Sequence, residues 1–227
     1  MLELGSRVNF HSHTVFSDGT LMPAGLVYEA VAREHAALCI TDHADGSNLE
    51  EILEKLTRFL RDQGPTLPIP VYPGVELSYL APSIIEKYAQ RARQHGAKIV
   101  LVHGETPAES AVPKGTNHAA LQCKGLVDVL AHPGLITEED AILAKVNDIY
   151  LELTPRRGHR EGNRHVARLA KEFGAKLIVN SDAHSEKDLI TQAEAFELAK
   201  EAGLKSAEAL IVVKDNAQEL LKRIASR

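Results

Sequence analysis

The sequence predicts an α/β fold with parallel strands, and two observations support this prediction. Short apolar or β-branched runs alternate with segments of helical periodicity along the chain. No linker, repeat or low-complexity tract interrupts this order, so one domain covering residues 1–227 is expected. Strands that alternate with helices are parallel and joined by helical crossovers, which leaves a doubly wound sheet or a closed barrel.

Eight runs of β-branched or apolar residues have the length of a strand. They cover residues 7–13, 37–43, 70–77, 98–103, 126–132, 148–153, 176–182 and 209–213. Segments with helical periodicity lie between strands, at residues 23–35, 48–62, 82–95, 160–173 and 187–201. Gly96, Gly174 and Gly203 follow helical segments, where glycine commonly ends a helix.

Composition limits the classes of protein that fit the chain. With 44% hydrophobic residues, its length suffices for one well-buried core. The net charge of -5 provides no general basic field, so nucleic acid is not an expected partner except as a short oligonucleotide substrate. Cys39 and Cys123 are too few for a disulfide framework, which favours a reducing, cytoplasmic setting. No secretion signal or apolar run near the roughly 20 residues of a membrane helix is visible, so no membrane partner is expected.

The first predicted strand ends in a pair of histidines. His11 and His13 are two residues apart, which places both imidazoles on the same face of a strand. Two nitrogens on one face can bind the same metal ion. A His-x-His pair also arises by chance in many proteins, so it does not identify a site alone.

Other predicted strands also stop at potential metal ligands. If these strands form a barrel, their carboxyl ends converge on one rim and share one pocket. For a single histidine at a strand end, capping the sheet is the more common role. Six histidines packed together would instead crowd polar rings that need hydrogen-bond partners. Divalent cations would satisfy these rings together with the carboxylates. The residues at strand ends are His11, His13, His43, Glu76, His103, His132, Asp182 and His184.

The motifs that carry these residues resemble the polymerase and histidinol phosphatase family of metal-dependent phosphoesterases, known as PHP domains. The family pattern begins with His-x-His and a Ser-Asp-Gly turn, here at residues 11–13 and 17–19. It continues with Thr-Asp-His, Gly-x-Glu, a strand-end His, Ala-His-Pro and Ser-Asp-x-His, which are found at residues 41–43, 74–76, 103, 131–133 and 181–184. The resemblance spans nearly the whole chain and implies a distorted TIM-like barrel of seven βα units.

The resemblance also implies two or three divalent metal ions, usually zinc, manganese or iron. Some relatives have a histidine in the loop that offers Asp18 here, so this ligand departs from the family pattern. The eighth strand candidate, residues 209–213, exceeds the family's seven strands. One ion would bind His11, His13, Glu76 and Asp182, a second would share Glu76 and add His103 and His132, and a third would bind Asp18, His43 and His184.

A metal-activated water would then attack a phosphate ester, with Glu76, Asp182 and His184 as the catalytic candidates. Asp182 and His184 are also candidates for the general acid that protonates the leaving alcohol.

A basic loop follows the sixth predicted strand, on the same rim as the ligands. Arg156, Arg157 and His159 are candidate contacts for the substrate phosphate, because guanidinium groups match its paired oxygens. A solvated loop capping the next helix is an equal interpretation for Arg156 and Arg160. The segment 104–116, rich in Pro, Gly and small residues, also follows a strand end, where barrel enzymes place substrate contacts.

The expected substrate is a small phosphate monoester, and histidinol phosphate is the first candidate by resemblance. A phosphodiester, such as a short oligonucleotide, is the alternative for the same site. Amidohydrolases also begin with His-x-His, but they bring a lysine or glutamate where His103 stands here. A barrel that only binds nucleic acid is a further alternative, which the complete ligand set disfavours. The sequence does not indicate the oligomeric state.

Overall fold

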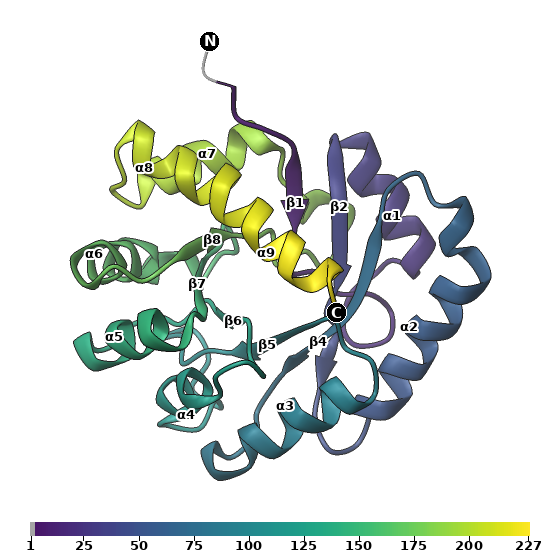
Figure 1. The fold of residues 1–227 in the computed structure, drawn as a ribbon, viewed down its shortest axis with the longest axis horizontal. Helices are drawn as coiled ribbons and strands as arrows, with labels where there is room; N and C mark the ends of the chain where they lie inside the picture. The colour runs from purple at the N-terminus through teal and green to yellow at the C-terminus, as the bar shows by residue number, and fades with distance from the viewer. Residues whose placement is uncertain (1–2) are drawn as a thin grey trace.

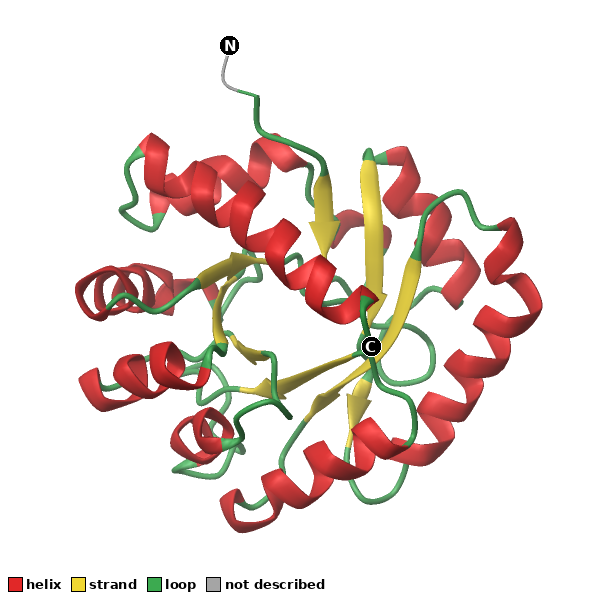
Figure 2. Cartoon of the chain, in the orientation of Figure 1, coloured by secondary structure: helices red, strands yellow, loops and turns green. Residues whose placement is uncertain are grey.

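The computed structural model describes residues 3–227 and has the predicted architecture (Figure 1). Parallel strands pair in the order β1-β2-β4-β5-β6-β7-β8, and the short strand β3 pairs with β4. Helices surround the strands on the outside (Figure 2). The fold is therefore a distorted TIM-like barrel. The strands are β1 (Arg7–Asn9), β2 (His35–Ile40), β3 (His43–Ala44), β4 (Val71–Leu77), β5 (Ile99–His103), β6 (Val129–Ala131), β7 (Tyr150–Leu153) and β8 (Leu177–Val179).

Helices α1, α2, α3, α6 and α7 agree with the predicted segments, whereas the sequence analysis did not name α4, α5, α8 or α9. Short 3₁₀ turns precede α3, α6 and α7, which explains why the predicted helical segments begin earlier than the α-helices. The helices are α1 (Pro23–Ala32), α2 (Leu49–Gln63), α3 (Ile85–Gln94), α4 (Thr116–Gln122), α5 (Glu138–Asn147), α6 (Asn163–Phe173), α7 (Gln192–Glu201), α8 (Ser206–Leu210) and α9 (Ala217–Ala225).

The prediction of an eighth strand at residues 209–213 is wrong. This run lies in α8 and in the π-helical turn that follows it, Ile211–Asn216. Ala209, Val212 and Val213 are buried, whereas Ile211 between them is 50% exposed. Spacings of three and four residues bring buried side chains to one face of a helix, and so short an apolar run does not distinguish this pattern from a strand.

The barrel is incompletely closed between β1 and β8. These strands share no ladder, and an isolated parallel bridge joins Ser12 to Ala183 just beyond their ends. Beside it, the side-chain carbonyl of Asn180 accepts a hydrogen bond from the backbone N–H of Phe10 at 3.0 Å. Side-chain amides therefore replace part of the missing ladder at this seam.

Helix α9 closes the amino end of the barrel. Leu220 and Ile224 of α9 are fully buried and pack with Val8, Ile99 and other residues of the barrel interior. Figure 1 shows α9 crossing the opening framed by the strands. Only the carboxyl ends of the strands are thus left open for a site. Within residues 3–227, no helix has the length and apolar character needed to cross a membrane.

Candidate metal centre

The predicted ligands converge at the carboxyl ends of the strands. Glu76 lies in β4, His103 ends β5 and His43 begins the short strand β3. Asp18 lies in the loop after β1, and the other ligands follow β1, β6 or β8 by a few residues. Because all the strands are parallel, these ends lie on the same rim of the barrel. The prediction that these residues, far apart in sequence, lie close together is confirmed by the distances below.

Glu76 stands at the centre of the cluster and is completely buried. Its Oε2 lies 3.2 Å from His11 Nε2 and 2.9 Å from His43 Nδ1, and its Oε1 lies 3.3 Å from His132 Nε2. Burial opposes ionisation of this carboxyl, but the histidines around it, above all His11 and His43, hold its pKa well below its ordinary value. Glu76 is therefore an anion in the interior of the protein.

The Glu76 carboxylate lacks hydrogen bonds despite its position. Neither of its oxygens has a partner of hydrogen-bonding geometry, and the Nδ1 atoms of His13 and His132 are also buried without one. A buried anion without hydrogen bonds is costly unless a cation compensates it. The cluster therefore fits divalent cations, for which imidazole nitrogens and carboxylate oxygens are suitable ligands.

Asp182 provides the second buried carboxylate. Its Oδ1 lies 3.3 Å from His13 Nε2 and 3.6 Å from His11 Nε2. Burial again raises the pKa of Asp182, but the neighbouring His11 and His13 outweigh this effect and hold it well below its ordinary value. Burial lowers the pKa of His13 to about 3, which leaves a neutral imidazole able to bind a metal.

Two of these residues have an unusual backbone conformation. Asp182 has a φ of 50° and His132 a φ of 28°, in or near the left-handed region that residues other than glycine rarely adopt. Such conformations cost on the order of 1–3 kcal/mol and are frequent at functional sites.

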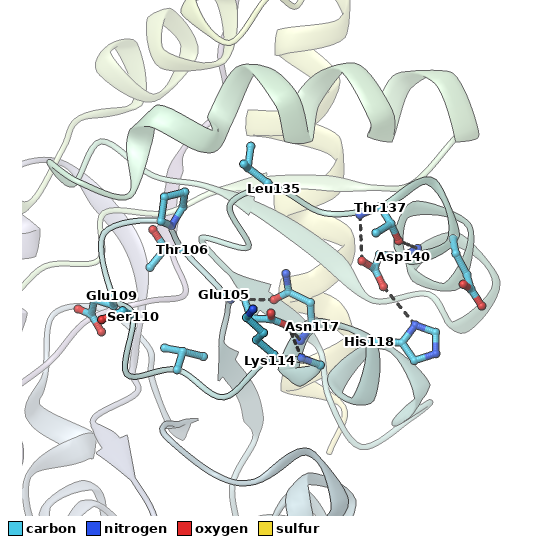
Figure 3. Close-up of a pocket in the computed structure, with 14 residues that line it drawn as sticks. Glu105, Thr106, Glu109, Ser110, Lys114, Asn117, His118, Leu135, Thr137 and Asp140 are labelled. Atoms are coloured by element: carbon cyan, nitrogen blue, oxygen red, sulfur yellow. Dashed lines mark hydrogen bonds and ion pairs between the residues drawn. The ribbon is translucent and has the colours of Figure 1, made fainter.

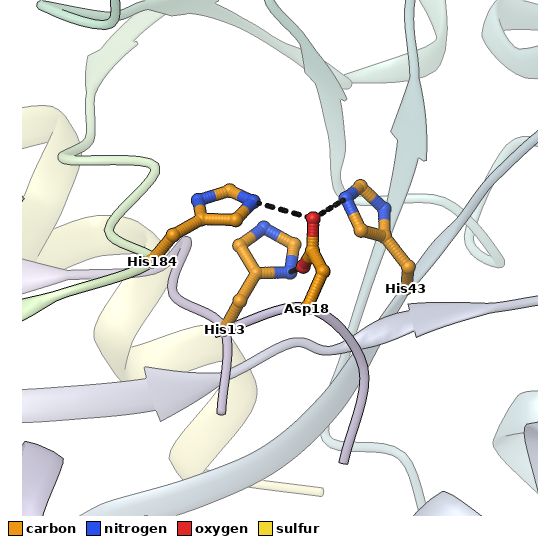
Figure 4. A group of neighbouring side chains, drawn as sticks. All are labelled: His13, Asp18, His43 and His184. Atoms are coloured by element: carbon orange, nitrogen blue, oxygen red, sulfur yellow. Dashed lines mark ion pairs between the residues drawn. The ribbon is translucent and has the colours of Figure 1, made fainter. Parts of the chain in front are cut away.

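A third group of potential ligands lies nearer the surface (Figure 4). Asp18 Oδ2 lies 3.2 Å from His184 Nε2 and 3.7 Å from His43 Nε2, and Asp18 Oδ1 lies 3.8 Å from His13 Nδ1. Burial raises the pKa of Asp18, but contact with His184 and His43 outweighs this effect and lowers the pKa below its ordinary value. The structure therefore places His13 beside the three residues expected to hold a third ion.

Asp42 explains how this surface group is held. Its carboxylate accepts hydrogen bonds from Thr14 N at 2.7 Å, Thr14 Oγ1 at 2.8 Å and Ser17 Oγ at 2.7 Å. Asp42 therefore fixes the loop that presents Asp18.

Four overlapping groups of residues can hold a metal ion. In each group, one ligand atom from every residue lies within 4.8 Å of the others. One group coincides with the second predicted set and one adds His13 to the third, whereas the first predicted set is divided between two groups, one of which includes His132. They are His11, His13 and Glu76; His11, His132 and Asp182; Glu76, His103 and His132; and His13, Asp18, His43 and His184.

The basic loop contributes unequally to the site. Arg156 Nε lies 3.6 Å from Asp182 Oδ2, and His159 is buried with its ring stacked on His132, centroids 4.2 Å apart. Arg157 is exposed and lines a neighbouring cavity. Arg160 points elsewhere and pairs with Glu201 at 3.2 Å. Arg156 and His159 are therefore the candidates that face the centre.

Tyr79 and Glu109 close one side of the centre, and the sequence analysis identified neither. Tyr79 has a φ of 56°, and its ring stacks on His103 with centroids 5.5 Å apart. Its hydroxyl donates to Glu109 Oε2 at 2.8 Å, and that oxygen lies 3.3 Å from His103 Nε2. The contact with His103 lowers the pKa of Glu109 to about 2. Glu109 lies in the loop at 104–116, and the composition of that loop was the available signal.

Three adjoining cavities surround the centre. The one at the ligands has a volume of about 330 Å³ and includes Arg156, Tyr79 and Glu109 in its wall. A cavity of about 420 Å³ adjoins it on one side, and we call it the basic cavity because Arg156, Arg157 and Lys187 outnumber Asp182 and Asp188 in its wall. On the other side, Glu109 also lines a cavity of about 650 Å³ between the loop at 105–115 and the helices α4 and α5 (Figure 3). The centre therefore has a basic side and an acidic side.

Glu152 is a further residue that the sequence analysis missed. It lies in β7, is 1% exposed, and accepts a hydrogen bond from His11 Nδ1 at 2.8 Å. A carboxylate within the otherwise apolar stretch Tyr150–Leu153 was the signal that could have found it.

Comparison with known protein families matches residues 9–211 to the PHP domain. An uncharacterized protein of Methanocaldococcus jannaschii is 45% identical over 96% of this chain and 100% of its own length. Ribonuclease P protein component 3 of Methanosarcina mazei is 27% identical, over 82% of this chain and 87% of its own.

Solved structures share the fold at low sequence identity. A histidinol phosphate phosphatase from Lactococcus lactis, in complex with zinc, L-histidinol and phosphate, has a TM-score of 0.62 and 16% identity, covering 88% of this chain and 95% of that one. A chain of an archaeal ribonuclease P with mature tRNA has a TM-score of 0.68 and 15% identity, covering 97% and 90%. At these identities the two likenesses concern the fold alone.

Proposed function

Because this chain belongs to the PHP domain family, we propose that it is a metal-dependent phosphoesterase that hydrolyses a small phosphate monoester. One observation carries the proposal. The buried Glu76 carboxylate has no hydrogen bond and lies among the imidazoles of His11, His43 and His132, with Arg156 on the rim of the same cavity. The cluster supplies cation ligands, and the rim supplies an anion-binding group.

Divalent ions at this site would polarise the phosphate and lower the pKa of an attacking water. We assign two or three ions to the ligand groups above, with Glu76 shared between two of them. Zinc, manganese and iron all suit such mixed imidazole and carboxylate ligands.

Side chains of the protein would bind the phosphate and protonate the leaving alcohol. Arg156 is 33% exposed beside Asp182, so its guanidinium can turn to the paired oxygens of a phosphate. The leaving alcohol would then face Tyr79 and Glu109. With only two ions bound, His184 is free of metal and is our candidate for protonating that alcohol, because its side chain lies at the mouth of the centre and is 13% exposed.

The acidic side of the centre favours a small monoester over a polynucleotide. The side chain of Glu109 is 33% exposed and carries its negative charge next to His103, where the rest of the substrate would lie. Further phosphates on that side would be repelled. Histidinol phosphate, which is small and carries no second phosphate, is the first substrate to test.

A phosphodiesterase acting on short oligonucleotides is the second candidate. The observation that favours it is the basic cavity lined by Arg156, Arg157 and Lys187, which adjoins the centre and suits a neighbouring phosphate. The relationship to ribonuclease P protein component 3 supports the same candidate.

Phosphate release by manganese- or zinc-reconstituted protein distinguishes the two. Histidinol phosphate, an aryl phosphate and a short oligonucleotide are the substrates, and chelated protein is the control. Efficient release from histidinol phosphate supports the monoesterase, whereas efficient cleavage of the oligonucleotide alone supports the second candidate. Absence of metal-dependent hydrolysis of all three would contradict both.

Substitution of Glu109 sharpens this comparison. In Glu109→Gln, loss of the negative charge should raise kcat/KM for the oligonucleotide relative to the monoester by about tenfold, or about 1.4 kcal/mol. Glu139→Gln changes a carboxylate in the same 650 Å³ cavity that does not line the centre, and should leave the ratio unchanged. Equal ratios in the wild type and Glu109→Gln would exclude the selective role of Glu109.

A further inference from the structure

Glu152 lies inside the barrel, directly beneath the metal centre. In β7, Leu151 and Leu153 pack in the core under the helices, whereas Tyr150 belongs to the interior cluster of the barrel. Side chains alternate along a strand, so Glu152 points to the interior like Tyr150. A carboxylate buried at this position needs hydrogen bonds or a charge partner to be tolerated.

Three donors satisfy the Glu152 carboxylate. Its Oε1 accepts from His11 Nδ1 and from Asn180 Nδ2, both at 2.8 Å, and its Oε2 accepts from the backbone N–H of His132 at 2.9 Å. Two of these donors belong to residues assigned as metal ligands, in the strand-end segments that follow β1 and β6. Glu152 therefore contacts two ligands at once without being in any of the potential ligand groups.

The hydrogen bond to His11 determines which ring nitrogen is free. Because a carboxylate only accepts, Nδ1 of His11 must carry a proton and donate it to Glu152. Nε2 is then the nitrogen available to a metal, and it lies 3.2 Å from Glu76 Oε2 and 3.0 Å from His13 Nε2. A partner on the second nitrogen fixes both the tautomer and the orientation of a metal-binding imidazole.

The same carboxylate braces the open seam between β1 and β8. Asn180, which donates to Glu152, also accepts from Phe10 N at 3.0 Å. On the other side of the seam, Asn9 Oδ1 accepts from Ser181 N at 2.8 Å and Asn9 Nδ2 donates to His11 O at 3.0 Å. Within the described residues, these side chains link the segment of His11 to the segment that leads to Asp182.

We propose that Glu152 is a positioning residue that orients His11 and His132 toward the metal centre. Through Asn180 it also links both residues to the seam between β1 and β8. This inference rests on the proposed metal centre. It also explains why a carboxylate occupies the position. Glutamine offers only one acceptor oxygen, and its NH₂ group is a donor. The NH₂ group would therefore face another donor, either the backbone N–H of His132 or the two donors at Oε1.

The first experiment measures metal affinity in Glu152→Gln by competition with a chromophoric chelator, using Zn²⁺ or Mn²⁺ alone as the probe. Loss of such a partner typically weakens binding on the order of 10- to 100-fold, and we expect that range here for at least one ion. Asp128→Asn is the matched control, because Asp128 is an equally buried carboxylate with several hydrogen bonds at the other end of the barrel. It should lower stability without changing metal affinity.

The second experiment does not depend on the variant folding. In the zinc-loaded wild type, ¹⁵N–¹H correlation spectra of the imidazoles should show His11 protonated at Nδ1. Zinc bound through Nδ1 of His11 overturns the inference, and so does wild-type affinity in a folded Glu152→Gln protein. A wild type that binds no metal overturns both this inference and the proposed function, whereas a metal-binding protein inactive on every phosphate ester overturns the proposed function alone.

Discussion

At the amino end of the barrel, the buried carboxylate of Asp128 is surrounded by arginines, whereas at the carboxyl end the buried Glu76 is surrounded by imidazoles. Arg227 binds both oxygens of Asp128 at 2.9 Å, Arg93 binds one at 2.5 Å, and the backbone N–H of Val100 donates to it at 3.0 Å. Glu76 has no hydrogen bond to either oxygen. The buried carboxylate at the amino end thus accepts hydrogen bonds on both oxygens, whereas the one at the carboxyl end accepts none.

The difference separates a structural charge from one that requires a ligand. Arginine is always protonated, so the amino end neutralises Asp128 with the protein's own cations. Imidazoles carry a full charge only when protonated and are better ligands when neutral. The carboxyl end therefore needs cations from outside, and that end alone is left open, because α9 covers the other.

The largest effect is expected at the carboxyl end. Asp182→Asn should lower kcat/KM for the best phosphate ester on the order of 10⁴-fold, or about 5 kcal/mol, since metal ligation supplies several kcal/mol of transition-state stabilisation. Thermal melts should show that the metal-free variant folds normally but gains less stability from added zinc than the wild type does. Turnover near the wild-type value would contradict the role of Asp182.

At the amino end, Asp128→Asn should act on stability and not on activity. Removing the buried partner of these ion pairs costs up to about 3 kcal/mol of the free energy of unfolding, because Arg93 and Arg227, whose side chains are only 15% and 27% exposed, lose their counter-charge. Urea denaturation of the metal-free protein measures this loss. If zinc affinity or kcat/KM fell in parallel, the two ends would be coupled and the comparison would fail.

A smaller effect concerns His35 at the start of β2, near the same end. Burial, with Arg7 and Arg33 nearby, lowers the pKa of His35 from 6.5 to about 4, and its Nε2 donates to Ile190 O at 2.9 Å. On acidification, His35 is therefore protonated at a higher pH in the unfolded chain than in the folded protein. The contribution to stability is complete above pH 6.5 and decreases as the pH falls to about 4, by at most about 3 kcal/mol.

Comparison of the wild type with His35→Gln isolates this contribution, because the glutamine amide can keep the hydrogen bond to Ile190. Urea denaturation at pH 7, 6, 5 and 4 should show the variant losing less stability than the wild type on acidification. Identical slopes for the two proteins would show that His35 does not titrate in this range.

Most of the site was predictable from the sequence because its residues follow strands. The position of His11, His43 or Asp182 after an apolar run is a local feature, and parallel strands bring such positions to one rim. Glu109 and Tyr79 were not predictable, because they reach the centre from loops whose path depends on packing. Glu152 was hidden inside a strand, where nothing local shows that its partners are His11 and Asn180.

The sequence by itself determined the alternation of strands and helices, the ligand types and their common rim, since periodicity and strand ends are properties of neighbouring residues. The tertiary structure decided the rest. It made residues 209–213 helical, because the spacing of Ala209, Val212 and Val213 meets the core only in a helix. It also left Glu76 without hydrogen bonds and gave Asp128 its arginines, because partners distant in sequence meet only when the barrel closes.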